Sequence, residues 1–210
     1  MQIISNCCAG AYIYRDYLKI QYPNPFIWNT ILLKDMYNLI KNYNIINFNN
    51  VELIRFKDYI PLSFFQGDKF MELQYNTLTG LRIDNIFDVF WTHNYYDKNA
   101  IIPRKQGGEV FYYKNYELTL ENWNKRITRL DKNEKPIFMI ITQKNKFGTR
   151  EDYVKLLNDF PNENIVIITS DKELLKYDTH NHRIYYNFCV DRSPEPILKE
   201  LYNELNLDFS

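Results

Sequence analysis

The residues with the clearest chemical potential lie together near the start of the chain, in the sequence Ser-Asn-Cys-Cys-Ala-Gly at positions 5–10. An apolar run at Met1–Ser5 precedes them and predicts a buried strand, and helical spacing of apolar residues follows over Ala9–Tyr17. A strand followed by a helix puts the segment at the carboxyl edge of a parallel sheet, where α/β proteins bind ligands. Backbone N–H groups at a helix start favour an anion and lower the pKa of a nearby thiol.

Three interpretations of this segment stay open. In the first, Cys7 is a nucleophile. In the second, the segment holds a phosphate or a sugar through its backbone N–H groups and its small residues, which are Ser5, Asn6, Cys8 and Gly10. In the third, the small residues only allow a strand and a helix to pack closely.

His93 is the candidate catalytic base. It follows the apolar stretch Ile83–Trp91, which predicts a strand, so we expect it at a strand end. There it would pair with Cys7 or activate a sugar hydroxyl. A structural histidine bonded to the backbone is the alternative.

Arg126 and Arg129 are candidate phosphate ligands. They are three residues apart in a predicted helix over Leu118–Leu130, which puts them on one face. Guanidinium forks suit recognition of a diphosphate. The alternative is a solvated face with ion pairs to Glu121 or Asp131.

Several familiar motifs are absent from the sequence. It contains no Gly-x-Gly-x-x-Gly, no Gly-Lys-Ser/Thr and no Asp-x-Asp, so it offers no dinucleotide, P-loop or metal–diphosphate signature. We interpret His180 and His182 as solvated, and with Cys189 they match no zinc spacing. Asp171 is expected to be a helix N-cap. We therefore predict no metal site and no cofactor.

Composition limits the class of protein. The chain has 210 residues, with 26 Lys and Arg against 26 Asp and Glu, and this balance argues against a general nucleic-acid binder. No apolar run is long enough for a transmembrane helix. The odd count of 3 cysteines, two of them adjacent, argues against a disulfide framework. We expect a protein of the cytoplasm with reduced thiols.

The last third of the chain indicates the fold. Apolar runs at 136–142, 164–169 and 182–188 alternate with helical segments at 149–158, after 171 and at 194–205, which is typical of βαβ units. We predict a single α/β domain over 1–210, with a three-layer, mostly parallel sheet and helices on both faces. A further helix is predicted at Thr30–Tyr43, and a further strand at Val51–Phe56. The range 57–117 would be an insertion or flap lobe, with a hairpin or flap near residues 101–113.

Segments in all parts of the chain carry a resemblance. The segment Ile4–Phe26, ISNCCAGAYIYRDYLKIQYPNPF, is followed by DNIFDVFWTHNYYD, by TLENWNKRITRLDKNEKPIFMIITQKN with its Trp-x-x-Arg-x-x-Arg pattern, and by LLNDFPNENIVIIT. In this order they resemble a bacterial family of unknown function encoded in exopolysaccharide-biosynthesis gene clusters. The chain departs from that family at Cys8 and at Tyr22–Pro25, where the family has a bulky residue and a Ser-Pro-Thr segment. Pro25-Phe26-Ile27-Trp28 is similar to a segment of a related, papain-like family.

The resemblance implies a cytoplasmic enzyme of surface-polysaccharide synthesis. The first expectation is a metal-independent, glycosyltransferase-like protein that takes a nucleotide-activated sugar and a glycan acceptor. Arg126 and Arg129 would then face the phosphates, and His93 would act on the acceptor hydroxyl. The alternatives are a papain-like cysteine hydrolase or acyltransferase that uses Cys7 and His93, and a non-catalytic partner in polysaccharide assembly.

Overall fold

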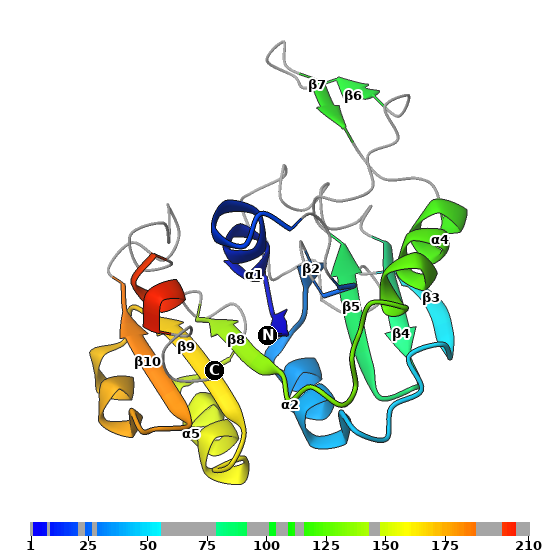
Figure 1. The fold of residues 1–210 in the computed structure, drawn as a ribbon. Helices are drawn as coiled ribbons and strands as arrows, with labels where there is room; N and C mark the ends of the chain where they lie inside the picture. The colour runs from blue at the N-terminus through cyan, green and yellow to red at the C-terminus, as the bar shows by residue number, and fades with distance from the viewer. Residues whose placement is uncertain are drawn as a thin grey trace.

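The computed structural model describes residues 2–7, 9–20, 24–26, 29–55, 79–91, 101–103, 109–111, 116–142, 148–187 and 199–204. Its strands form a four-stranded parallel sheet, a four-stranded antiparallel sheet and a two-stranded sheet. Figure 1 shows the two larger sheets side by side, with helices packed around them. The predicted α/β class is confirmed.

The parallel sheet contains the strands predicted from the continuous apolar runs. Its order is β1 (Ile3–Ser5), β8 (Ile137–Ile141), β9 (Asn164–Thr169) and β10 (His182–Tyr186). The register pairs Ile4 with Phe138 and Phe138 with Ile165. Every residue of β1 and β8 is buried, because side chains on both faces of the sheet pack against other elements.

The helices of this part begin where the sequence predicts. Helix α5 (Arg150–Asp159) follows Thr149, which forms a capping box with Asp152. The 3₁₀ helix η4 (Lys172–Tyr177) follows Asp171, whose carboxylate accepts a hydrogen bond from Glu173 N. Near the start of the chain, α1 (Ala9–Tyr12) continues directly into the π-helical turn η1 (Ile13–Tyr17).

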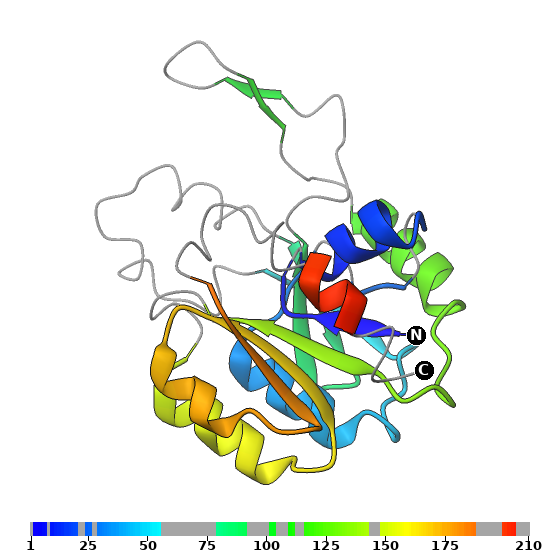
Figure 2. The same ribbon diagram turned by 60° about the vertical axis from the view of Figure 1, so that its left-hand side comes forward.

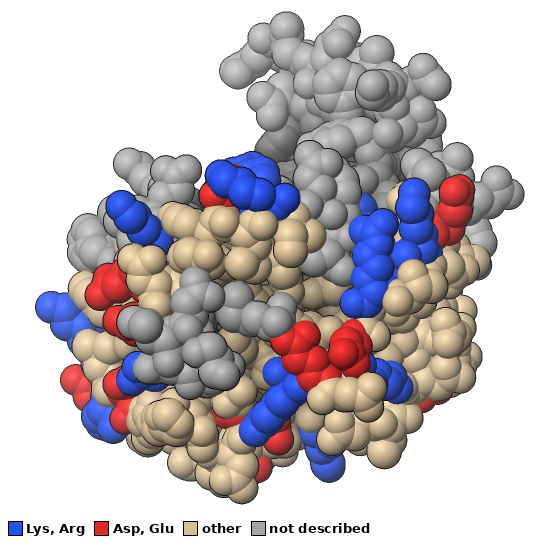
Figure 3. Space-filling model, in the orientation of Figure 1, with Lys and Arg blue, Asp and Glu red and all other residues tan. Residues whose placement is uncertain are grey.

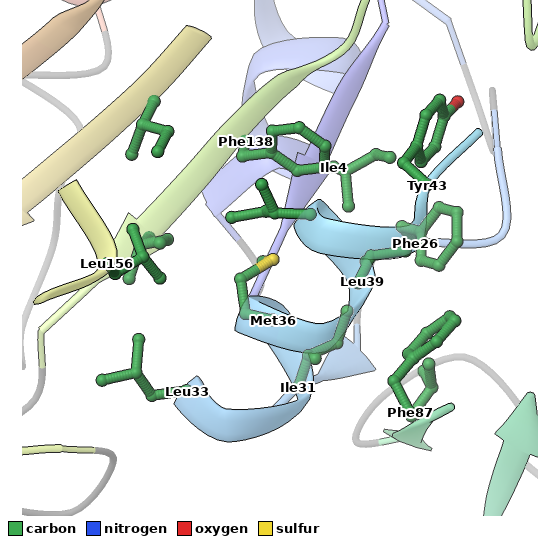
Figure 4. Packing of buried hydrophobic residues seen from close by; sticks show 14 of the residues in the cluster. Ile4, Phe26, Ile31, Leu33, Met36, Leu39, Tyr43, Phe87, Phe138 and Leu156 are labelled. Carbon is green, nitrogen blue, oxygen red and sulfur yellow. The ribbon is translucent and has the colours of Figure 1, made fainter. Parts of the chain in front are cut away.

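Successive residues of each strand point to opposite faces of the sheet and pack into two separate apolar clusters. One contains Ile3 of β1 together with Ala11 and Ile13, and it also includes Leu201 of the helical segment 199–204. The other contains Ile4 of β1 and Phe138 of β8, with residues of α2 (Leu33–Asn42) and α5 packed against them. Figure 2 shows α1 and segment 199–204 across the sheet from α5, and Figure 4 shows Met36 and Leu39 beside Phe138 and Ile4.

The antiparallel sheet is the largest departure from the sequence prediction. Its order is β2 (Asn29–Thr30), β5 (Phe87–Trp91), β4 (Thr79–Ile83) and β3 (Val51–Arg55). The prediction of one strand over 83–91 was wrong, because a turn separates β4 from β5. Asp84 and Asn85 hold φ angles of 52° and 54°, the left-handed region that this turn requires. The predicted helix over Thr30–Tyr43 begins later, because Thr30 belongs to β2.

The remaining described elements lie in or after the middle of the chain. β6 (Ile101–Pro103) and β7 (Glu109–Phe111) form a small antiparallel sheet, which confirms the predicted hairpin. β4 and β5 fall within the range 57–117 and pair with β3 and β2. Helix α4 spans Tyr116–Ile127. None of the helices in the described part of the chain has the length and apolar character needed to span a lipid bilayer.

Candidate functional site

The strongest candidate site lies between the carboxyl ends of β1 and β8. These strands are neighbours in the sheet, but the helices that follow them pack on opposite faces. α1 follows β1 on the face of Ile3, whereas α5 follows β8 on the face of Ile4. Ligands of open α/β sheets bind outside the strand ends at such a switch point. This is the edge at which the sequence placed residues 5–10.

Asn6 is the first residue after β1 and joins its end to the end of β8. Its backbone N–H donates to Met139 O at 3.0 Å and its carbonyl accepts from Ile31 N at 3.1 Å. Its side chain pairs with the backbone of Ile141: Oδ1 accepts from Ile141 N at 2.9 Å, and Nδ2 donates to Ile141 O at 3.2 Å. Asn6 is only 3% exposed. Its amide therefore ties the ends of β1 and β8 together.

Ser5 and Gly10 lie in the contact between β1 and α1. Both are buried, and the Ser5 hydroxyl accepts from Cys7 N at 3.4 Å. A Cβ atom added to Gly10 would lie 3.0 Å from Ser5 Cβ and 3.3 Å from Ile3 Cγ2. α1 thus approaches β1 as closely as a glycine allows, which is what the close-packing interpretation requires at Gly10.

Cys7 is the more accessible member of this segment. Its side chain is half-buried at the strand end and packs against the cluster that contains Ile3 and Ala11. The position suits a thiol that contacts a bound molecule. Cys8 and His93 lie outside the described residues. The distance between Cys7 and His93 is therefore not described either.

The neighbouring strand ends contribute hydroxyl groups that were not predicted as site residues. Thr142 Oγ1 donates to Thr169 Oγ1 at 2.8 Å, and Thr169 Oγ1 also accepts from Asp171 N at 3.0 Å. Both threonines are buried. The available signal was a threonine at the end of two apolar runs, PIFMIIT and NIVIIT. A polar residue closing a buried strand marks the sheet edge.

An exposed ion pair stands next to these threonines. Arg150 binds Asp171 with both ends of its guanidinium fork, at 2.5 and 3.0 Å. The hydrogen bonds from Arg150 hold the pKa of Asp171 below its usual value, and the same bonds raise the pKa of Arg150. This guanidinium was not predicted as a site residue, although it lies close to the edge.

The two predicted phosphate ligands are in different environments. Arg126 lies on α4 and is 5% exposed, whereas Arg129 is exposed and follows the end of the helix. Trp123, three residues before Arg126, is fully buried and donates from Nε1 to Phe48 O at 2.9 Å. The Trp123–Arg126 face of α4 is therefore directed inward, and only Arg129 presents its side chain to solvent.

The histidines of the last third also differ from expectation. His180 is exposed as predicted, but His182 is 6% exposed and its Nε2 donates to Phe160 O at 2.9 Å. The prediction of a solvated His182 was wrong, because this residue begins β10. Both line a cavity of about 470 Å³ at the amino ends of β9 and β10, away from the β1–β8 edge.

The described residues contain no group of three or more His, Cys, Asp or Glu side chains placed to hold a metal ion. On the face shown in Figure 3, Lys and Arg lie interspersed with Asp and Glu. The chain matches no protein-family model and no curated protein.

Proposed function

We propose that the chain is a transferase of surface-polysaccharide synthesis that binds a nucleotide-activated sugar at the β1–β8 edge and acts in the cytoplasm. The observation that supports this most is the switch point itself, where adjacent parallel strands send their helices to opposite faces. Residues 5–10, which belong to one of the segments that resemble the exopolysaccharide family, begin at this switch point.

The proposed chemistry assigns one task to each group. Cys7 contacts the sugar or phosphate at the strand end, with Asn6 fixing the geometry of the strand pair beneath it. Arg150, beside the strand-end threonines, is the guanidinium assigned to the diphosphate. Arg129 is not assigned to it, because Asp131 N donates to Gln2 Oε1 and this stretch lies at the amino ends of β1 and β8. His93 removes the proton from the acceptor hydroxyl. The leaving diphosphate is neutralised by guanidinium groups without a metal ion.

The finer architecture is part of the same proposal. The parallel sheet would be the middle of three layers, since its two faces feed separate clusters with different helices. The range 57–117 would form a lobe beside the β1–β8 edge that completes the acceptor site. Truncation of this lobe at 92–115, with a short Gly-Ser linker, would then remove acceptor binding and spare donor binding.

Donor binding is the direct test. We expect one member of a panel of common nucleotide sugars to raise the melting temperature and to give a saturable calorimetric signal. Cys7→Phe, which fills the strand end, should abolish both signals, whereas Asn162→Ala, at an exposed and distant position, should leave them unchanged. The proposal fails if no donor stabilises the protein, or if Cys7→Phe binds the donor as the unaltered chain does.

A cysteine hydrolase or acyltransferase is the second candidate, and the half-buried Cys7 at the strand end favours it. Such a thiol would react with iodoacetamide at neutral pH faster than a model thiol, and His93→Ala would slow the reaction. Rapid, His93-dependent labelling would favour this candidate over the transferase. Slow labelling together with donor binding would favour the transferase. Slow labelling without donor binding would leave the non-catalytic partner.

A further inference from the structure

A buried pair of carboxyl groups joins α2 to the antiparallel sheet. Asp35, in the first turn of α2, is 4% exposed, and its Oδ1 accepts from Asp88 N of β5 at 3.2 Å. Its other oxygen, Oδ2, is buried and has no hydrogen-bond partner. If the carboxyl group were charged, one of its two oxygens would be buried without a hydrogen-bond donor, which is unfavourable.

The charged groups around Asp35 do not neutralise it. Asp88 is 2% exposed and forms an ion pair with Arg82 of β4, at 3.0 and 3.3 Å. Arg82 therefore compensates the charge of Asp88, and Asp88 repels a charge on Asp35. Lys34 lies next to Asp35 on α2, but it is exposed to solvent. Burial, and then repulsion by Asp88, raise the pKa of Asp35 to about 7.

Because α2 contacts both large sheets, a change at Asp35 affects the packing of both. The helix packs between the two large sheets, with Met36 and Leu39 in the cluster that also contains Phe138 of the parallel sheet and Phe87 of the antiparallel sheet. Figure 4 shows Met36 and Leu39 between Phe138 and Phe87. The backbone immediately before the helix reaches the candidate site, because Ile31 N donates to Asn6 O.

We propose that a protonated Asp35 carboxyl holds α2 against β5, and that loss of this proton loosens the helix from the antiparallel sheet. The sign follows from linkage. An unfolded Asp titrates near 3.9, so between about pH 4 and pH 7 the folded chain retains a proton that the unfolded chain has lost. Stability contributed by this group is therefore greatest at low pH and falls as the pH rises to about 7.

Urea unfolding between pH 5 and pH 8 tests the effect on stability. Relative to Asp35→Asn, the unaltered chain should lose up to about tenfold in its folding equilibrium constant per pH unit, until the loss levels off above about pH 7. Asp16→Asn is the matched control, because Asp16 is exposed and paired with Arg15. Asp16→Asn should keep the pH dependence of the unaltered chain. A pH slope that is the same in Asp35→Asn and the unaltered chain would overturn the proposal.

Two measurements apply even if Asp35→Asn does not fold. The carbon-13 resonance of the Asp35 carboxyl group in the unaltered chain should titrate near neutrality, whereas that of Asp16 should titrate below its usual value. Amide hydrogen exchange in α2, corrected for the intrinsic effect of pH, should accelerate between pH 6 and pH 8. An Asp35 titration near pH 4, or exchange in α2 that does not change, would contradict the inference.

Discussion

The side chain of Asn6 pairs with the backbone of Ile141 as a further strand residue would, accepting from its N–H at 2.9 Å and donating to its carbonyl at 3.2 Å. The pair extends the contact of β1 and β8 past the point where β1 ends at Ser5. Because an amide side chain carries the same donor and acceptor as a peptide unit, it satisfies both polar groups of Ile141. The ends of two strands are thus fixed beneath the candidate site.

Loss of this pair should destabilise the chain. Asn6→Ala leaves the buried N–H and C=O of Ile141 without partners, and we expect a loss of about 3 kcal/mol in the free energy of unfolding. Asn6→Asp keeps the acceptor but loses the donor and should also destabilise. Urea denaturation measures both. Asn162→Ala, on the surface, should change stability by less than about 0.5 kcal/mol, and an equal effect of Asn6→Ala would show that the pair contributes little.

The contact between Gly10 and Ser5 should be visible in a double-mutant cycle. Gly10→Ala places a Cβ atom 3.0 Å from Ser5 Cβ, so we expect a net loss of about 1 kcal/mol or more, despite the better helix propensity of alanine. Ser5→Gly removes the opposing atom. The double variant should be more stable than the sum of the single changes predicts. Strict additivity, measured by thermal unfolding, would count against the close contact.

The two threonines at the strand ends should respond unequally to replacement by valine. Thr169→Val removes the acceptor of two hydrogen bonds, from Thr142 Oγ1 and from Asp171 N, and should cost about 2 kcal/mol. Thr142→Val removes a donor to a single acceptor and should cost less. Chemical denaturation of the two variants compares them directly. A larger effect of Thr142→Val would mean that Thr169 is not the shared acceptor.

The turn between β4 and β5 should favour glycine at position 85. Asn85 has a φ angle of 54°, which a β-branched residue adopts only with strain. Asn85→Val should therefore destabilise by about 1–2 kcal/mol, while Asn85→Gly should be neutral or stabilising. The exposed side chain of Asn85 makes this a clean comparison of backbone conformations. Differential scanning calorimetry of both variants gives the result, and equal melting temperatures would exclude a strained φ angle.

Local signals predicted the parallel sheet and the caps of its helices. Apolar runs at 136–142 and 164–169 are long enough to be buried strands, and Thr149 and Asp171 are residues that cap helices through their side-chain oxygens. Each of these signals acts within a few residues of the chain. They correctly predicted that these strands belong to a parallel sheet.

The antiparallel sheet was not predicted from local signals in the sequence. The Asp84–Asn85 turn was a usable signal, since both residues tolerate positive φ angles, but the apolar residues on either side masked it. The two-residue strand β2 is too short for any periodicity. Its position depends on Trp91 and Phe90 of β5, which are about sixty residues away along the chain.

The sequence by itself determined the α/β class, the buried strands of the last third and the strand-to-helix transition at residues 5–10. Those features depend on hydrophobic periodicity and on local hydrogen bonds. Only the tertiary structure decided that Asn6 binds Ile141, that Arg126 is buried while Arg129 is exposed, and that Asp35 meets Asp88. These relationships join residues far apart in the chain, and the packing of whole sheets and helices sets which side chains meet.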